Sequence, residues 1–363
     1  MLEITPLKFE NDKLTILDQT KLPGEEVWIE LKTKEDVWDA IKKLKVRGAP
    51  AIGVCAAYGL YISVNKYCPM KDDGIECEER GDRFPKFVHE TAEYLNSSRP
   101  TAVNLSWALK RMLKVMDMKY KMNPGFACHN AKKVLLQEAI KIHQEDVDSC
   151  MAMGENGLKL LEPGMGILTH CNAGTIATSK YGTCLAPIHL GQERDYGFRV
   201  FCDETRPLLQ GARLTAWELV KNGVDTTLIC DNMASIAMKN GWIDAVMVGC
   251  DRMAANGDGA NKIGTSGVAI LAHEYGIPFY MFVPTSTIDL DTPTGNDIPI
   301  ELRDGNEIRE MWYEKPMAPE GVKTYNPAFD VTDHKYITAV VTEKGIVRPP
   351  YDENLKKLFE KDV

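Results

Sequence analysis

A cysteine and an aspartate each follow an apolar run at a point where a strand is expected to end. Cys171 comes directly after the run 166–170, and Asp251 follows the run 243–249. In an open parallel sheet, ligands bind in the crevice beyond the carboxyl ends of the strands, so both side chains would lie at that edge. A thiol and a carboxylate placed there form a workable acid and base pair, because each environment can move a pKa towards neutrality.

Both residues also have an ordinary structural interpretation. Buried free cysteines are common and mostly inert, so Cys171 is equally compatible with a packing role. Asp251 is compatible with a helix cap or with an ion pair to Arg252. Position alone leaves both interpretations open.

Two further segments at the same edge have the composition of ligand-binding loops. Residues 251–265 are rich in glycine, and Asn261 and Lys262 are expected at a helix start, where backbone amides bind phosphate or hydroxyl groups. A solvated turn is the alternative. Residues 204–215 follow another predicted strand, and Gln210 is a neutral donor suited to sugar hydroxyls or phosphate.

Two arginines stand just before predicted helix starts. Arg47 is followed by Gly48 and Ala49, and Arg99 precedes a helix that begins with a proline. The guanidinium fork matches the oxygens of a phosphate. Tight helix packing through the glycine is the alternative, but two arginines at helix starts favour one bound anion.

The elements that must position these residues form a helical part and an α/β part. Apolar residues recur at helical intervals over 34–66, 84–115 and 131–161, and the acidic segment 68–83 is expected to be an exposed loop. Six short apolar runs then alternate with helical patterns, which is typical of a parallel α/β sheet: 166–170, 198–202, 227–230, 243–249, 277–283 and 336–342. Helices are expected between them, for example over 211–222 and 232–240.

We therefore predict an α/β protein with two domains. A smaller, mainly helical N-terminal domain would cover 1–130, a connecting helix 131–162, and a Rossmann-like parallel-sheet domain 163–363. The length of 363 residues and the hydrophobic content of 44% suffice for two cores.

Composition and motifs exclude several classes of function. The net charge of -9 argues against a broad nucleic-acid or anionic-membrane surface. The ten cysteines include no C-x-x-C pair and no nearby pair of histidines, so we expect no metal site. Neither a G-x-G-x-x-G nor a P-loop motif follows the first strand, which disfavours a dinucleotide or triphosphate cofactor. Without a leader or a long apolar run, a cytoplasmic protein with reduced thiols is expected.

Four motifs in combination resemble one family over nearly the whole chain. They are Arg47–Gly53, Thr169–Gly174, Glu204–Gly211 and Gly249–Arg252. Together they closely resemble the methylthioribose-1-phosphate isomerases. The fold and the C-terminal pattern are shared with regulatory subunits of translation initiation factor 2B and with ribose-1,5-bisphosphate isomerase.

The resemblance implies a function and a set of site residues. It implies a homodimeric aldose–ketose isomerase of methionine salvage that converts 5-methylthioribose 1-phosphate to 5-methylthioribulose 1-phosphate without a cofactor. Cys171 and Asp251 match the catalytic positions of the family. The positions that match its substrate-binding residues, chiefly for the phosphate, are Arg47, Gly48, Ala49, Arg99, Gln210, Asn261 and Lys262.

Two questions stay open at the level of sequence. The substrate could instead be ribose 1,5-bisphosphate or 5-deoxyribose 1-phosphate, or the chain could be a non-catalytic regulatory subunit. An aldose phosphorylated at its anomeric oxygen cannot open freely, so we expect Asp251 to handle the ring-oxygen or hydroxyl proton while Cys171 moves a proton between carbons. A hydride shift is the rival route.

Overall fold

The computed structural model describes residues 4–67, 83–100, 102–122 and 128–360, which form two compact units. The helical unit holds residues 5–148 together with 176–180, and the sheet unit holds 149–175 and 181–363 with Ile4. The change from one unit to the other thus falls inside a helix rather than in a linker. The predicted division at 130 and 162 stays a prediction.

The core of the helical unit is built around one almost fully buried helix. This helix, α2 (Ala49–Tyr67), is buried without interruption from Ala51 to Val64. The remaining helices pack around the same core: α1 (Lys34–Lys42), α3 (Arg83–Asn96), α4 (Val103–Met122) and the first part of α5 (Cys128–Leu158). The helical stretches predicted in this part of the chain are therefore confirmed. Most of the predicted acidic loop, 68–82, lies outside the described residues.

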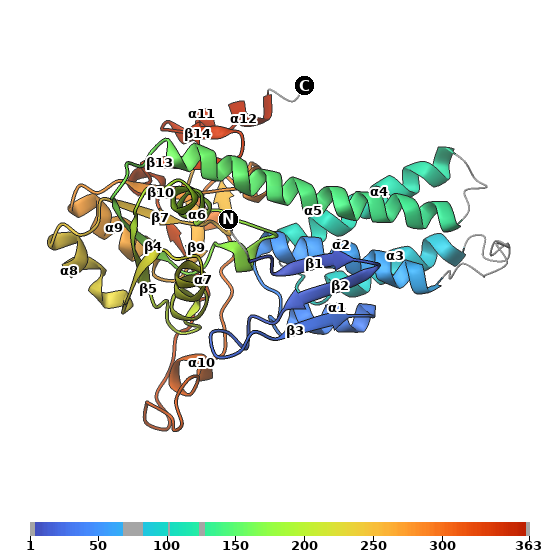
Figure 1. The fold of residues 1–363 in the computed structure, drawn as a ribbon, viewed down its shortest axis with the longest axis horizontal. Coiled ribbons are helices and arrows are strands. Elements are labelled where there is room, and N and C mark those ends of the chain that lie inside the picture. Colours follow the sequence, from blue (N-terminus) through green and yellow to red (C-terminus); the bar gives the residue numbers. More distant parts are fainter. Residues whose placement is uncertain (1–3, 68–82, 101, 123–127, 361–363) are drawn as a thin grey trace. The chain divides into compact units, whose positions relative to one another are not determined.

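The helical unit also contains a small sheet that the sequence analysis missed. The antiparallel strands β1 (Leu7–Glu10), β2 (Lys13–Leu17) and β3 (Trp28–Leu31) lie side by side beside α2 (Figure 1). Asn11 and Asp12 join the first two strands, and both adopt a positive φ, as in a tight hairpin turn. An Asn-Asp pair between two short alternating runs was the available signal.

The sheet unit contains a seven-stranded sheet in the order β14-β13-β10-β7-β4-β5-β6. All neighbouring pairs are parallel except β13 and β14. The strands are β4 (Gly166–His170), β5 (Arg199–Asp203), β6 (Asp225–Ile229), β7 (Ala245–Val248), β10 (Phe279–Phe282), β13 (Ala339–Thr342) and β14 (Gly345–Val347). Each of the six predicted runs overlaps one of these strands, so the parallel α/β architecture is confirmed.

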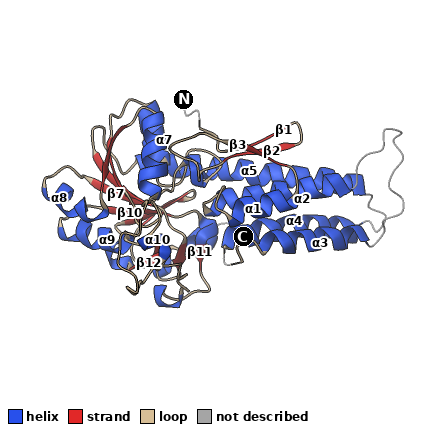
Figure 2. Ribbon diagram, turned by 90° about the horizontal axis from the view of Figure 1, so that it is seen from below, coloured by secondary structure: helices blue, strands red, loops and turns tan. Residues whose placement is uncertain are grey.

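Helices cover both faces of this sheet. In Figure 2, α7 (Ala216–Lys221) lies on one side of the strands β7 and β10, whereas α9 (Thr265–Glu274) lies on the other side. The remaining helices are α6 (Ala186–Glu193), α8 (Ala234–Lys239), α10 (Asn306–Arg309), α11 (Tyr351–Asn354) and α12 (Lys357–Glu360). The helices expected over 211–222 and 232–240 are present, the first opening with a π-helical segment and the second with a 3-10 turn. No helix in the described ranges combines the length and apolar character needed to cross a membrane.

The segment predicted as a glycine-rich loop before a helix start is instead part of a second sheet. Strands β8 (Arg252–Ala254) and β9 (Gly259–Lys262) form an antiparallel hairpin, flanked by β11 (Ile288–Asp289) and β12 (Phe329–Thr332). Asn261 and Lys262 therefore lie on a strand, which corrects the expected helix start. Helix α9 begins at Thr265, after β9 has ended at Lys262. The Asp330 carboxylate on β12 accepts hydrogen bonds from the Gly264 and Ser266 amides at the start of this helix.

Candidate active site

The order of the strands places Cys171 and Asp251 at the ligand-binding edge of the large sheet. Across the sheet, the six parallel strands lie in the order β6-β5-β4-β7-β10-β13. When they are numbered by their order in the chain, this order is 3-2-1-4-5-6, and it reverses between β4 and β7. Such a switch point opens the crevice in which doubly wound proteins bind ligands. Cys171 directly follows β4, and Asp251 comes three residues after β7 ends. Because His170 pairs with Val248, the two strands end level with each other.

The backbone of Cys171 adopts a left-handed conformation that its neighbours hold in place. Its φ is 67°, a region that non-glycine residues enter at a cost and that clusters at functional sites. The Cys171 amide donates to Thr205 Oγ1 at 2.8 Å, and Thr215 Oγ1 donates to the Cys171 carbonyl at 2.6 Å. The thiol-bearing residue is only 6% exposed. These bonds fix the direction in which the chain leaves β4.

A buried carboxylate holds the residues that follow Cys171. Glu218 on α7 is fully buried and accepts from the Asn172 side-chain amide and, at 2.7 Å, from the Thr175 amide. His189 Nε2 lies 3.4 Å from the same carboxylate, and His189 Nδ1 faces the Asn222 amide nitrogen at 3.0 Å. Because that amide nitrogen is a donor, Nδ1 is the acceptor and Nε2 carries the proton that reaches Glu218.

Asp251 is exposed, in contrast to the cysteine before it. Its amide donates to the Ala260 carbonyl at 2.9 Å, which fixes Asp251 at the open end of the β8–β9 hairpin. Burial raises the pKa of Cys250 far above the usual range, so that thiol remains protonated and is unsuited to proton transfer at neutral pH. Of these two neighbouring residues, Asp251 is the more exposed.

Gln210 has an unsatisfied buried acceptor at the same edge of the sheet. It lies beyond β5, at the start of the π-helical segment Gly211–Thr215, and is 6% exposed. Its side-chain Oε1 is buried and has no hydrogen-bond partner. A buried polar atom without a partner is uncommon in a native protein, and a ligand hydroxyl would satisfy it.

The β9 residues Asn261 and Lys262 are both buried and have their polar ends engaged. Asn261 Nδ2 donates to Thr265 Oγ1 at 3.0 Å. Lys262 Nζ donates to the Ala328 carbonyl at 3.1 Å and lies 4.3 Å from the centre of the Phe329 ring.

The other four predicted binding residues belong to the helical unit. Arg47 and Gly48 precede α2, which begins at Ala49, and Arg99 precedes α4. The two helix starts lie close together, since a Cβ added to Gly53 would be 2.9 Å from the Asn104 carbonyl oxygen. Their predicted role in holding the phosphate of the ligand stays a prediction.

Gly48 is required by the close packing at this helix start. Its φ is +96°, and an added Cβ would lie 2.3 Å from the Ala177 carbonyl oxygen. A larger residue would therefore meet both backbone strain and a steric clash. Tight packing, the structural alternative for Gly48, is thus supported. It says nothing about the predicted role of Arg47.

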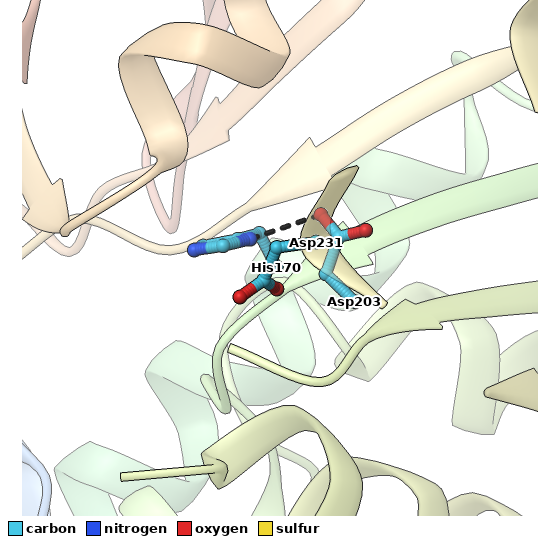
Figure 3. A group of neighbouring side chains, drawn as sticks. All are labelled: His170, Asp203 and Asp231. Atoms are coloured by element: carbon cyan, nitrogen blue, oxygen red, sulfur yellow. Dashed lines mark hydrogen bonds and ion pairs between the residues drawn. The ribbon is translucent and has the colours of Figure 1, made fainter. Parts of the chain in front are cut away.

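The sequence analysis did not assign His170 and Asp203 to the site. His170 Nδ1 lies 2.9 Å from Asp203 Oδ2, and the Asp231 carboxylate lies nearby (Figure 3). The ligand atoms of these three residues lie within 4.8 Å of one another, as in a metal site. However, both ring nitrogens already have partners, and Asp231 accepts from the Thr205 and Arg206 amides at 2.7 Å. The arrangement is that of a hydrogen-bonded cluster at the ends of three strands, β4, β5 and β6.

The fold and this edge define a doubly wound α/β protein with polar side chains gathered at its switch point. The family model of the initiation factor 2 subunit family matches residues 45–349. The chain belongs to this family.

Relatives of similar length have names that describe isomerases. A methylthioribose-1-phosphate isomerase from Symbiobacterium thermophilum is 58% identical, with 99% of this chain and 97% of the relative covered. A 5-deoxyribose 1-phosphate isomerase from Petrotoga mobilis is 57% identical, with coverages of 98% and 99%.

Two solved structures are also similar over almost their full length. That of 5-methylthioribose 1-phosphate isomerase from Pyrococcus horikoshii has a TM-score of 0.88 and 41% identity, and covers 98% of this chain and 96% of its own. A structure from A. fulgidus described as translation initiation factor eIF-2B subunit delta has a TM-score of 0.87 and 39% identity, with coverages of 99% and 100%.

Proposed function

We propose that this protein is an aldose–ketose isomerase of methionine salvage that converts 5-methylthioribose 1-phosphate to 5-methylthioribulose 1-phosphate. Two observations together support the proposal. Full-length relatives have this name. In this chain, a thiol and a carboxylate follow the neighbouring strands β4 and β7 at the switch point. The predicted site residues have the chemistry that a sugar phosphate needs: arginines and a lysine for the phosphate, and amides for the hydroxyls.

The chemistry requires a proton to leave one carbon and reach its neighbour. The proton on C2 moves to C1, and the bond between C1 and the ring oxygen breaks. The hydroxyl on C2 becomes the ketone, and the released ring oxygen gains the proton that this hydroxyl loses. We assign the transfer between carbons to Cys171 and the oxygen protons to Asp251. A mostly buried Cys171 suits an enolate-like intermediate that must be kept from water.

A second substrate is favoured by one specific observation. The Petrotoga mobilis relative is named a 5-deoxyribose 1-phosphate isomerase, and its identity of 57% is close to the 58% of the methylthioribose relative. The two sugars differ only by a thiomethyl group at C5, which a hydrophobic pocket distinguishes by about 1–3 kcal/mol. Measuring kcat/KM for both sugars with the purified protein decides which is preferred.

The catalytic assignment is tested by replacing the two reacting groups. We expect Cys171→Ser and Asp251→Asn each to lower kcat by about 100-fold or more, because each removes an acid or base group. Cys230→Ser and Asp225→Asn are matched controls at exposed positions outside the site. Full activity in either site variant would contradict the assignment, and absence of turnover by the unmodified protein would favour a non-catalytic subunit.

The route of hydrogen transfer is tested in deuterated water. Proton transfer through Cys171 exchanges with solvent, so we expect deuterium at C1 of the product. Product without deuterium fits either the hydride shift or a proton transfer shielded from solvent, so only deuterium at C1 decides the route.

A further inference from the structure

Both ring nitrogens of His170 face hydrogen-bond acceptors. Nδ1 lies 2.9 Å from Asp203 Oδ2, and Nε2 lies 2.8 Å from the Ile263 carbonyl oxygen. A carbonyl cannot donate, so the Nε2 position must carry a proton. The proton between Nδ1 and Asp203 Oδ2 belongs to one of these two atoms, and it lies on Nδ1 when Asp203 is ionised. Burial raises the pKa of Asp203, whereas the hydrogen bond and the charge of His170 lower it. With Asp203 ionised, the geometry calls for an imidazolium ring, with two donors between two acceptors.

The surroundings of the ring favour this positive charge. His170 is 2% exposed and Asp203 is fully buried, so neither charge can be compensated by water. Burial alone lowers the pKa of His170, but the hydrogen bond and charge of Asp203 outweigh it, with Asp231 adding to the effect, and the pKa is raised. Two further acidic groups lie near the pair of His170 and Asp203: Glu204, directly after β5, and Asp231, after β6. Lys262, on β9, directs its ammonium group towards the Ala328 carbonyl.

The ring joins two segments that carry predicted site residues. On one side it belongs to the last residue of β4, and the next residue is Cys171. On the other side it bonds Ile263, which directly follows Asn261 and Lys262 on β9. The backbone of Gly264 packs so tightly on the ring that an added Cβ would lie 2.9 Å from His170 Cε1. The ring is therefore a fixed spacer between the end of β4 and the end of β9.

We propose that His170 is a positioning residue, an imidazolium that Asp203 holds in place and that sets the distance from Cys171 to Asn261 and Lys262. The role rests on the proposed function, because these are the residues that the isomerase would use on its substrate. His170 itself acts through the backbone of its neighbours. Asp203 orients the ring and supplies the opposite charge, and the Ile263 carbonyl accepts the hydrogen bond from Nε2–H.

The protonation state is tested without any measurement of activity. In protein labelled with 15N-histidine, we expect both His170 nitrogens to show the protonated form throughout pH 6 to 8, with His170→Leu identifying the resonances. In Asp203→Asn the amide can donate to Nδ1, so this nitrogen should change to the unprotonated form while Nε2 stays protonated. A neutral His170 ring in the unmodified protein would overturn the imidazolium.

The positioning role is tested by separating KM from kcat. His170→Leu leaves the Ile263 carbonyl without its donor, so we expect KM for the sugar phosphate to rise about tenfold, the size of one lost charged hydrogen bond. Asp203→Asn retains the bond to Ile263 and should raise KM less. His89→Gln is the matched control, because His89 also contacts an aspartate, Asp117 at 3.0 Å, but both side chains are exposed.

The outcomes separate this proposal from the proposed function. An unchanged KM in His170→Leu, with an intact fold by circular dichroism, would refute the positioning role while the isomerase assignment stands. If His170→Leu does not fold, Asp203→Asn decides. This variant loses the ion pair but keeps the donor to the Ile263 carbonyl. An unchanged KM, or a rise of about tenfold or more, would therefore contradict the roles given to Asp203 and to the Ile263 contact. If the protein shows no turnover, the function fails, and the labelled-histidine experiment still decides the state of the ring.

Discussion

At the scale of single residues, the segment around Cys171 is held by buried groups whose donors and acceptors are matched. Cys171 is held between two threonine hydroxyls, and the segment after it is held by Glu218. A carboxylate offers only acceptors, which suits a position surrounded by an amide side chain, a backbone amide and a histidine N–H. Removing one member leaves the others buried without partners, which costs more than the bond itself contributes.

Glu218→Gln tests this matching. The new amide nitrogen must face a donor on at least one side, so we expect the free energy of unfolding to fall by about 1–3 kcal/mol and kcat to fall with it. Urea unfolding and steady-state kinetics measure the two effects. Glu155→Gln is the matched control, because Glu155 pairs with Arg194 at the surface, where such pairs contribute about 0–1 kcal/mol. Equal stability of the two variants would contradict the role of Glu218.

At the scale of elements, a single carboxylate joins the turn of the β8–β9 hairpin to two distant segments. Asp258, 8% exposed, accepts from the Gly295 amide at 3.0 Å and from the Asn256 side chain at 2.7 Å. Its other oxygen accepts from the His334 amide at 2.9 Å and from His334 Nδ1 at 2.7 Å. Burial by itself raises the pKa of Asp258, but these hydrogen bonds outweigh it and the pKa is lowered. Three segments distant in sequence are thus joined at the turn of the hairpin.

Asp258→Asn tests this connection and its pH dependence. Since the folded pKa lies below the unfolded value of about 3.9, the contribution of Asp258 is complete above that value and is lost as the pH falls through the folded pKa. We expect the variant to be about 1.5–3 kcal/mol less stable at pH 7, and the difference to shrink below about pH 4. Urea unfolding at several pH values measures it.

The control for Asp258 is another aspartate that contacts a histidine. Asp117 lies 3.0 Å from His89 Nε2, but both side chains are exposed by 40% or more. Asp117→Asn should therefore change stability by less than about 1 kcal/mol at pH 7. A difference between Asp258→Asn and the unmodified protein that stays constant down to pH 3 would contradict the account.

At the scale of the whole molecule, the cysteines separate by burial. Burial raises the pKa of both Cys55 in the helical unit and Cys184 in the sheet unit to about 12, and it raises that of Cys202 further. Cys230 is exposed, although the charge of Glu204 also raises its pKa. A cysteine reacts only when its thiol is ionised and the reagent can reach it. We therefore expect the buried cysteines of both units to be protected from alkylation in the folded protein.

Iodoacetamide labelling of the native protein at pH 8, mapped by peptide mass spectrometry, tests this expectation. Cys230 should be labelled in the folded protein, whereas Cys55, Cys184 and Cys202 should be labelled only after unfolding in urea. Labelling of Cys184 in the folded state at the rate of Cys230 would show that the sheet unit opens around the candidate site.

The large sheet was predictable from the sequence because its strands are short apolar runs. Parallel strands are buried on both faces, so β4, β7, β10 and β13 appear as continuous apolar stretches separated by helical patterns. The same pattern places Cys171 and Asp251 just beyond two strand ends. The small sheet of β8, β9, β11 and β12 was not predictable in this way, because its strands are only two to four residues long and contain glycine and polar residues.

The sequence by itself determined which residues end the strands, and so which side chains could carry the chemistry. Only the tertiary structure decided which strands are neighbours, since pairing depends on contacts between residues far apart in the chain. It made β4 and β7 adjacent, so that Cys171 and Asp251 share the switch point. It also brought the Ile263 carbonyl to the second nitrogen of His170, 93 positions away, where the need to satisfy a buried acceptor sets the protonation of the ring.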